Sequence, residues 1–331
     1  MALGERKDAQ DFVSQTQWEK WNLAKEHAQV YNQWFTQQNI DLAFKGLGNM
    51  LEENKAVEWL SKYVQKFPAT EEKKVGVIMA GNIPLVGFHD MMCVLISGHK
   101  ALCKMSSDDN VFYPLIKEQL VSWNNEWEDK ICLIDEKLEG HEAVIATGSN
   151  NTARYFEYYF KEVPHIIRKN RNAVAILDGN ESKEEIFNLG EDIFQFFGLG
   201  CRNVSKVFLP EGFELNRIYE GIFEHGEVIH HNKWCNNYEY NKAVYLLSTF
   251  PFLDNNFLLL KEDDEAIVSP LGVLFYQFYR DEQELRKLLE GREEEIQCII
   301  SKKDIPFGKA QCPELWDYAD GVDTMEFLIG L

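Results

Sequence analysis

Short apolar runs of strand length alternate with helical patterns through most of this chain. The clearest runs cover residues 75–80, 101–104, 131–134, 143–146, 173–177 and 204–209. Continuous apolar runs are typical of strands that are buried on both faces by helices, as in parallel sheets. The alternation therefore predicts an α/β fold with mainly parallel sheets.

The first part of the chain, residues 11–67, has a different spacing of apolar residues. Apolar residues recur there at steps of three and four, and four of the eight tryptophans lie in it. This spacing predicts helices that end at Pro68. The tryptophans indicate a packing face, and an aromatic platform for a ligand is the alternative.

The chain of 331 residues is long enough for two domains, and we place their boundary near residues 169–172. Residues 182–197 and 213–225 are predicted to be helical, whereas 226–262 show no clear period. The stretch 271–279 resembles a strand and 281–291 a charged helix. The last residues, 299–331, are predicted to be mostly loop with a closing strand.

The charge balance limits the partners. Lys and Arg number 34 against 54 acidic residues, a formal charge of -20, which disfavours nucleic acid and anionic membranes. Seven cysteines without regular spacing indicate reduced thiols. The charged first residues lack a signal core, and the apolar stretch 83–98 is too short to cross a bilayer. We therefore expect a soluble, cytoplasmic protein without a membrane span.

One cysteine has suggestive neighbours. Cys201 follows a Gly-Leu-Gly turn between a helical run and a strand, with Arg202 beside it and Lys206 close by. Nearby cations lower the pKa of a thiol and favour the reactive thiolate. The residue is thus a candidate nucleophile, and a buried cysteine in an ordinary turn is the alternative.

Three further loops follow strands, where open α/β sheets bind ligands. In the first, Asn82 could donate to an oxyanion or cap the next helix. In the second, Lys104 and the hydroxyls after it could hold ribose or phosphate, or form a solvated loop. In the third, Thr147-Gly148-Ser149 could bind phosphate at a helix N-terminus, or simply cap that helix.

Common signatures are missing. The sequence has no Walker run, no Gly-x-Ser-x-Gly elbow and no complete dinucleotide glycine motif. His230, His231 and Cys235 lack a second pair of ligands nearby, so we predict no metal site.

Taken in order, these loops resemble the aldehyde dehydrogenase superfamily. Asn82 in Gly-Asn-Ile-Pro-Leu resembles the Trp-Asn-Phe-Pro asparagine, and Lys104-Met-Ser106-Ser107-Asp resembles the Lys-Pro-Ser-Glu ribose loop. Thr147-Gly148-Ser149 resembles the Thr-Gly-Ser pyrophosphate turn, and Gly200-Cys201 the Gly-x-Cys nucleophile. Residues 269–273 resemble the Phe-Gly-Pro-Val motif more weakly. Residues 305–311 and 315–323 are similar to the C-terminal signature of one branch, the fatty acyl-CoA reductases of the LuxC type.

The resemblance implies a fold and a division of the chain. The fold would be aldehyde dehydrogenase-like, with two Rossmann-like parallel-sheet domains and an N-terminal helical segment at 1–70. An NAD(P)-binding domain would span 71–171 and a catalytic domain 172–305, followed by a C-terminal return segment at 306–331.

The resemblance also implies a reaction. Cys201 would be the nucleophile and Asn82 the oxyanion donor, while Lys104, Ser106, Ser107, Thr147, Gly148 and Ser149 would bind the cofactor. Relatives that oxidise aldehydes carry a glutamate that activates water, and the corresponding residues 165–169 here contain none. This favours reduction of a fatty acyl-CoA over aldehyde oxidation, with His165 as a candidate acid or base.

Ser107 stands where NAD-preferring relatives carry a glutamate, so NADPH is the expected cofactor and NADH the alternative. A local basic patch of Arg168, Lys169 and Arg171 with Lys73, Lys74 and Lys104 would meet these polyanions.

Other functions stay open. A short-chain CoA-acylating aldehyde dehydrogenase and an acyl-phosphate reductase share the resemblance, and an inactive scaffold is the non-enzyme alternative. A homo-oligomer or an acyl-transfer partner enzyme is a further expectation.

Overall fold

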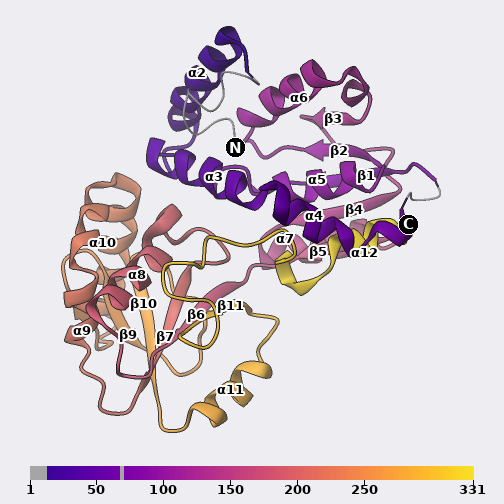
Figure 1. The fold of residues 1–331 in the computed structure, drawn as a ribbon. Helices are drawn as coiled ribbons and strands as arrows, with labels where there is room; N and C mark the ends of the chain where they lie inside the picture. The colour runs from indigo at the N-terminus through magenta and orange to yellow at the C-terminus, as the bar shows by residue number, and fades with distance from the viewer. Residues whose placement is uncertain (1–12, 68–70) are drawn as a thin grey trace. The chain divides into compact units, whose positions relative to one another are not determined.

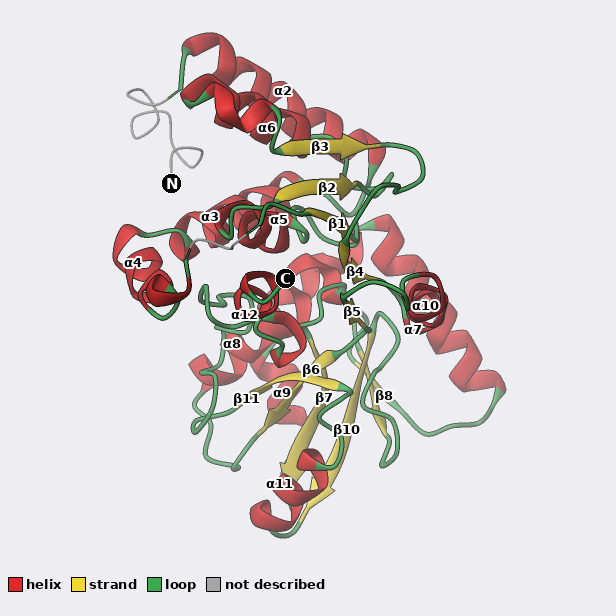
Figure 2. Ribbon diagram, turned by 90° about the vertical axis from the view of Figure 1, so that its right-hand side faces the viewer, coloured by secondary structure: helices red, strands yellow, loops and turns green. Residues whose placement is uncertain are grey.

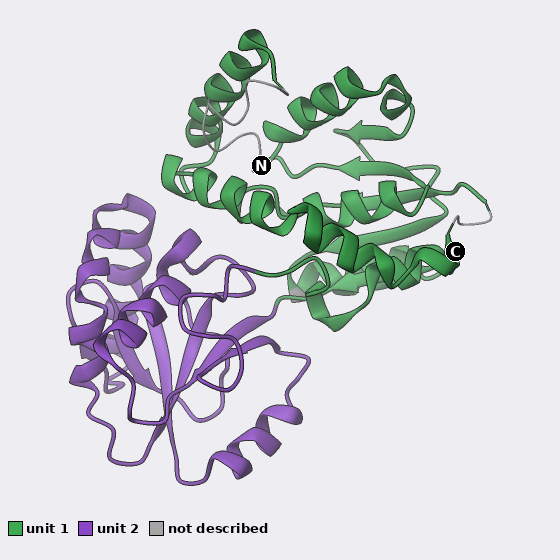
Figure 3. Ribbon diagram, viewed as in Figure 1, with its two compact units in different colours: residues 1–170, 313–331 green, residues 171–312 purple. Residues whose placement is uncertain are grey.

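A computed structural model describes residues 13–67 and 71–331 of the chain (Figure 1). The chain forms two compact units, shown in Figure 3. Unit 1 comprises residues 1–170 and 313–331, and unit 2 comprises 171–312. Of the segment predicted to return at 306–331, residues 306–312 thus belong to unit 2 and the rest to unit 1. The helix end predicted at Pro68 lies outside the described residues.

Unit 1 contains a parallel sheet of five strands in the order β3-β2-β1-β4-β5. The strands are β1 (Lys74–Ile78), β2 (Lys100–Lys104), β3 (Ile131–Ile134), β4 (Ala143–Thr147) and β5 (His165–Arg168). The central strands are short apolar runs because both faces are covered, and Val75, Val144 and Ile145 are fully buried.

Three helices connect these strands: α5 (Phe88–Ile96), α6 (Phe112–Trp123) and α7 (Asn150–Tyr159). Helices α5 and α7 cover opposite faces of the sheet (Figure 2). The direction in which strands are added reverses between β1 and β4. Strands β2 and β3 lie on one side of β1, whereas β4 and β5 lie on its other side. A reversal of strand order at this point opens a crevice at the carboxyl ends of the strands.

The N-terminal helices are α2 (Gln15–Tyr31), α3 (Gln37–Met50) and α4 (Glu53–Ser61). Ser14 starts α2 with a capping box that it shares with Gln17. Trp21 and Trp59 are buried, and the Trp59 indole donates to the Tyr318 hydroxyl at 2.8 Å. These two tryptophans therefore pack in the core, as the spacing of apolar residues predicted.

Unit 2 contains six strands in the order β11-β6-β7-β10-β9-β8. They are β6 (Asn172–Ile176), β7 (Val204–Pro210), β8 (Leu253–Asp254), β9 (Leu259–Glu262), β10 (Val273–Tyr279) and β11 (Ile296–Ile300). All pairings are parallel except that of β8 with β9. The helices are α8 (Lys183–Phe194), α9 (Asn216–Gly221), α10 (Asn232–Leu247) and α11 (Glu282–Glu290).

The α/β fold with mainly parallel sheets is confirmed, and two local predictions are corrected. The chain closes with helix α12 (Thr324–Ile329), capped by Asp323, where we expected a strand. Strand β5 was not predicted, because only Ile166 and Ile167 are apolar in it. Within the described ranges, no helix is long and apolar enough to span a membrane.

Candidate functional site

Three of the predicted loops leave the sheet of unit 1 at the same edge. The registers pair Ile78 of β1 with Lys104 of β2 and with Ala146 of β4, so these strands end side by side. The loops that follow, 79–87, 105–111 and 148–149, therefore meet at the reversal of strand order. This is the edge at which α/β sheets of this kind bind ligands.

The loop with Asn82 is held by three side chains from other segments. The buried Asn32 donates to the carbonyl oxygens of Gly81 at 3.4 Å and Asp108 at 3.3 Å. Asp109 accepts the N–H of Leu85 at 2.7 Å, and Tyr113 accepts that of Gly87 at 3.1 Å. The loops after β1 and β2 are thereby tied to each other.

Asn82 itself is exposed in this loop. The alternative in which it caps the next helix is wrong, because the N-cap of α5 is Gly87. Asn82 therefore lies at the exposed surface of the loop that follows β1.

Asp109 was not singled out by the sequence, and it is buried beneath the two loops. Burial raises the pKa of its carboxyl group to about 7, although the N–H of Leu85 lowers it. Its position four residues before Tyr113 of α6 gives no pattern from which this role could have been predicted.

Lys104 ends β2, and Ser106 and Ser107 lie in the loop that follows it. The Lys104 ammonium donates to the carbonyl of Asp135 at 2.6 Å, and the Ser106 hydroxyl accepts the N–H of Asp108 at 3.2 Å. Ser107 is exposed, so its hydroxyl faces solvent at this edge of the sheet.

Thr147 ends β4, and Gly148 and Ser149 form the loop that follows it. Ser149 is the N-cap of α7, and its hydroxyl accepts the N–H of Thr152 at 3.3 Å. A Cβ on Gly148 would lie 3.0 Å from Phe156 and 3.1 Å from Thr152, so a side chain would crowd the start of the helix. The predicted cap is thus present, and α7 starts directly at the loop edge.

His165 is not brought to these loops. It pairs with Val144 at the amino end of β5, whereas Thr147 pairs with Arg168 at the carboxyl end. Three residues of a strand separate the two positions by about 10 Å. The side chain is exposed, and its Nδ1 lies 2.8 Å from the carbonyl oxygen of Val163.

The expected basic patch is corrected at Arg168. This side chain is 3% exposed, where an anion from solvent cannot reach it. It pairs with Asp90 at 2.7 Å and donates to the Thr324 hydroxyl at 2.8 Å. Its task is to join β5, α5 and α12 inside unit 1. Lys169 next to it is exposed and pairs with Glu157 at 3.1 Å.

Cys201 lies in unit 2, in the turn between α8 and β7, and is partly buried. Phe196, Phe197 and Gly198 before it have φ angles of 51°, 55° and 70°. Left-handed backbone at two consecutive phenylalanines is strained, by about 1–3 kcal/mol for each residue. Such strain persists only where surrounding bonds enforce it, and it is characteristic of functional turns.

Asn203 supplies those bonds. Its Oδ1 accepts the N–H of Gly200 at 2.8 Å, and its Nδ2 donates to the carbonyls of Asp192 at 3.0 Å and Gln195 at 2.8 Å. The side chain is 1% exposed. Sequence reasoning missed it, although an asparagine three residues after a glycine in a turn is a local signal of this kind of bond.

The two cations near Cys201 in the sequence have different surroundings. The Arg202 Nε donates to the carbonyl of Ala310 at 2.6 Å. Lys206 is fully buried on β7 and donates to the carbonyl of Ala266 at 3.0 Å. Desolvation lowers the pKa of Lys206 to about 8, and the charges that act on it come from residues 263–295. Lys206 is therefore a core residue of β7.

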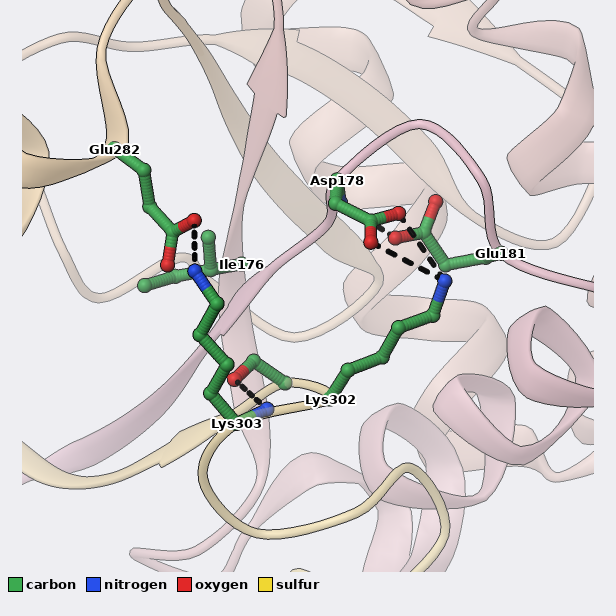
Figure 4. A pocket seen from close by; sticks show the side chains of 7 residues that line it. Ile176, Asp178, Glu181, Glu282, Lys302 and Lys303 are labelled. Atoms are coloured by element: carbon green, nitrogen blue, oxygen red, sulfur yellow. Dashed lines mark hydrogen bonds and ion pairs between the residues drawn. The ribbon is translucent and has the colours of Figure 1, made fainter.

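Each unit also has a concavity. A cavity of about 350 Å³ in unit 1 is lined almost wholly by apolar side chains of α2, α5, α6 and the turn after α6. A small pocket of about 20 Å³ in unit 2 is lined by charged residues, shown in Figure 4. There Lys302 pairs with Asp178 at 3.2 Å and Lys303 with Glu282 at 2.6 Å. Each of these two lysines is thus paired with a carboxylate of the same pocket.

Within the ranges that the structure describes, no group of three or more His, Cys, Asp or Glu residues could hold a metal ion.

No protein-family model matches the sequence, and a search of curated proteins finds no match. Solved structures of the same fold do match. Aldehyde dehydrogenase 21 from Physcomitrella patens, in complex with the reaction product succinate, has a TM-score of 0.60 at 13% identity. That match covers 86% of this chain and 72% of the other.

Two further similar structures contain a cofactor. The aldehyde dehydrogenase of Mycobacterium tuberculosis, complexed with NAD+, has a TM-score of 0.51 at 14% identity and 71% coverage of this chain. This chain spans 61% of the length of that protein. A mutant of the indole-3-acetaldehyde dehydrogenase AldA of P. syringae, with NAD+ and IAA, has a TM-score of 0.55 at 11% identity. The match covers 87% of this chain and 72% of the AldA chain.

These likenesses define the class of structure: the chain has the aldehyde dehydrogenase fold. The fold that the loop motifs implied is therefore confirmed.

Proposed function

We propose that this protein reduces a long-chain fatty acyl-CoA to the fatty aldehyde, with NADPH as the reductant and an S-acyl intermediate on Cys201. The observation that carries the proposal is the strained turn at Cys201 in a chain with the aldehyde dehydrogenase fold. The bonds of Asn203 hold the backbone of this turn, as a positioned nucleophile requires.

In the first half of the proposed reaction, the Cys201 thiolate bonds to the thioester carbonyl carbon, and the bond to the CoA sulfur breaks. CoA leaves and takes up one proton. The Cys201 N–H donates to the carbonyl oxygen as its negative charge develops, and the Asn82 amide is the further donor that the resemblance of its loop implies.

The second half regenerates the thiol. A bound nicotinamide cofactor would supply the hydride that reduces the acyl carbon of the Cys201 thioester. The thiohemiacetal on Cys201 then breaks down to the aldehyde and the free thiolate. Residues 165–168 form strand β5, and neither they nor Lys169 supply a carboxylate that could activate water, which favours an acyl group that awaits the hydride.

The loops of unit 1 fit a dinucleotide. Three strand ends meet beside the reversal of strand order, and the bare Gly148 lets a ligand approach the first turn of α7. The free N–H groups of that turn would face a pyrophosphate. Lys104 and Ser106 would lie along the ribose. The exposed hydroxyl of Ser107 could donate to a 2′-phosphate, so we propose NADPH over NADH.

A substrate panel tests the proposal. Consumption of NADPH and of NADH is followed with acyl-CoA esters from two to sixteen carbons and with an acyl phosphate. We expect the highest kcat/KM with a long-chain ester and NADPH. Preference for acetyl-CoA or for the acyl phosphate would instead favour the corresponding alternative reductase.

Two variants complete this experiment. Cys201→Ala should abolish turnover, whereas Cys235→Ala, which removes a partly buried thiol of α10 in the same unit, should leave it unchanged. No turnover of any substrate by the wild type, together with no binding of either nucleotide, would favour the inactive scaffold and refute the proposal.

A further inference from the structure

Resting on the proposed function, in which Cys201 is the nucleophile, we infer that Asp192 is a positioning residue for the Cys201 turn. It acts through the segment 306–312, which it holds against Arg202.

The side chain of Asp192 forms one half of this arrangement. Its carboxylate accepts the N–H of Gly308 at 2.7 Å and that of Ala310 at 2.9 Å. The carbonyl of Ala310 in turn accepts the Nε–H of Arg202 at 2.6 Å. A single peptide segment is thus bound on one side by Asp192 and on the other by the residue that follows Cys201.

The main chain of Asp192 forms the other half. Its carbonyl accepts the Nδ2–H of Asn203, whose Oδ1 accepts the N–H of Gly200. Gly200 and Arg202 flank Cys201 in the sequence, and both are connected to Asp192 by two successive hydrogen bonds. The position of the nucleophile therefore depends on one carboxylic acid near the end of α8.

The packing of the segment leaves it little freedom. Ala310 is fully buried and Phe307 is 7% exposed. Gly308 has a φ of +80°, and a Cβ there would lie 3.1 Å from the Cβ of Asn188 on α8. Residues 305–311 were notable in the sequence only as part of a C-terminal signature. In the structure, hydrogen bonds connect them to Asp192 of α8 on one side and to Arg202 of the Cys201 turn on the other.

The arrangement requires an ionised Asp192. A carboxylate accepts at both oxygens, whereas a protonated acid turns one oxygen into a donor that faces an N–H group. The pKa of Asp192 is raised to about 7: burial is the main cause and Glu191 adds to it, whereas the two N–H groups and Lys309 act in the opposite direction. The segment should consequently be held less firmly as the pH falls through 7.

The first test separates the hydrogen bond of Arg202 from its charge. Arg202→Gln keeps an N–H donor at the same number of bonds from the backbone as Nε, and Arg202→Met has similar length without a donor. We expect the rate at which acyl-CoA acylates Cys201 to stay within about threefold in the Gln variant and to fall about tenfold or more in the Met variant. Equal loss in both variants would assign the effect to charge and overturn the inference, as would no loss in either.

The second test uses the pH dependence. In Asp192→Asn one oxygen becomes a donor at every pH, and we expect acylation about 10²-fold slower than in the wild type at pH 8.5. Because the two proteins differ only at residue 192, the ratio of their acylation rates at each pH isolates the contribution of Asp192. This ratio should shrink toward 1 at pH 5.5. A ratio that does not change with pH would show a merely structural role and contradict the inference.

Asp304→Asn is the matched control. Like Asp192, Asp304 is a carboxylate of unit 2 that accepts hydrogen bonds, in this case from the Ser301 hydroxyl and from Arg286. It follows the carboxyl end of β11, however, whereas Cys201 precedes the amino end of β7. The acylation rate of Asp304→Asn should stay within about threefold of the wild-type rate at every pH. If Asp192→Asn does not fold, the Arg202 pair decides alone. Absence of acylation in the wild type refutes the proposed function, whereas acylation that is equal in wild type and variants refutes only the role of Asp192.

Discussion

Removal of the Asn203 side chain should loosen the Cys201 turn, because this side chain bonds to the backbone on both sides of the strained residues. In Asn203→Ala the buried N–H of Gly200 loses its acceptor, and the carbonyls of Asp192 and Gln195 lose their donor. A buried donor without a partner costs about 1–3 kcal/mol, and each of the other bonds contributes about 1 kcal/mol. The expected loss is therefore about 3–5 kcal/mol, with the left-handed angles of Phe196 and Phe197 no longer enforced.

Hydrogen exchange measures this loss locally. The amide of Gly200 should exchange about two to three orders of magnitude faster in Asn203→Ala than in the wild type, since 1.4 kcal/mol corresponds to about a factor of ten. Peptides from the sheet of unit 1 should be unaffected. Asn236→Ala, at an exposed position of α10, is the control and should change stability by less than about 0.5 kcal/mol. Unchanged exchange at Gly200 in Asn203→Ala would refute the assignment of Asn203 as the residue that holds the turn.

Three further changes test other parts of the structure. Asn82→Ala should slow acylation by about 10²–10³-fold with little change in melting temperature, because the side chain is exposed; an unaltered rate would remove Asn82 from the site. Asp90→Ala leaves Arg168 buried without its partner and should lower the free energy of unfolding by about 3–5 kcal/mol in urea titrations, so a loss below 1 kcal/mol would contradict the account of that pair. The pKa of Asp109 is raised from 3.8 to about 7, so folding takes up a proton between these values and stability falls as the pH rises through that window. In Asp109→Asn this part of the slope should disappear from the urea midpoints between pH 4 and 7, and an identical slope in both proteins would show that Asp109 does not titrate there.

The elements that sequence reasoning placed correctly are those with a clear apolar pattern. Residues 131–134 were predicted as a strand and form β3 with the same bounds. Helix α10 has no such pattern, because its buried residues are three aromatic side chains and Asn241, and they stand among further asparagines and lysines. Helix α12 follows a loop rich in proline and glycine, and its six residues are too few for a period to be recognised.

The candidate site was predictable in part for the same reason. Loops such as that of Asn82 carry local motifs that stand directly after strands. The residues that hold the loops in place have partners far away in the sequence. Asp192 binds Gly308 and Ala310, which lie 116 and 118 residues further on, and Asn32 binds Gly81 49 residues away. No local pattern encodes such a pair, so only the folded chain reveals it.

The most direct test of the proposed function is the intact mass of the protein before and after NADPH is added. After incubation with a long-chain acyl-CoA, the wild type should carry one acyl group and Cys201→Ala none. Addition of NADPH should then remove the group and release one equivalent of the fatty aldehyde. An adduct of equal abundance in Cys201→Ala, or release of the fatty acid in place of the aldehyde, would contradict the proposed function.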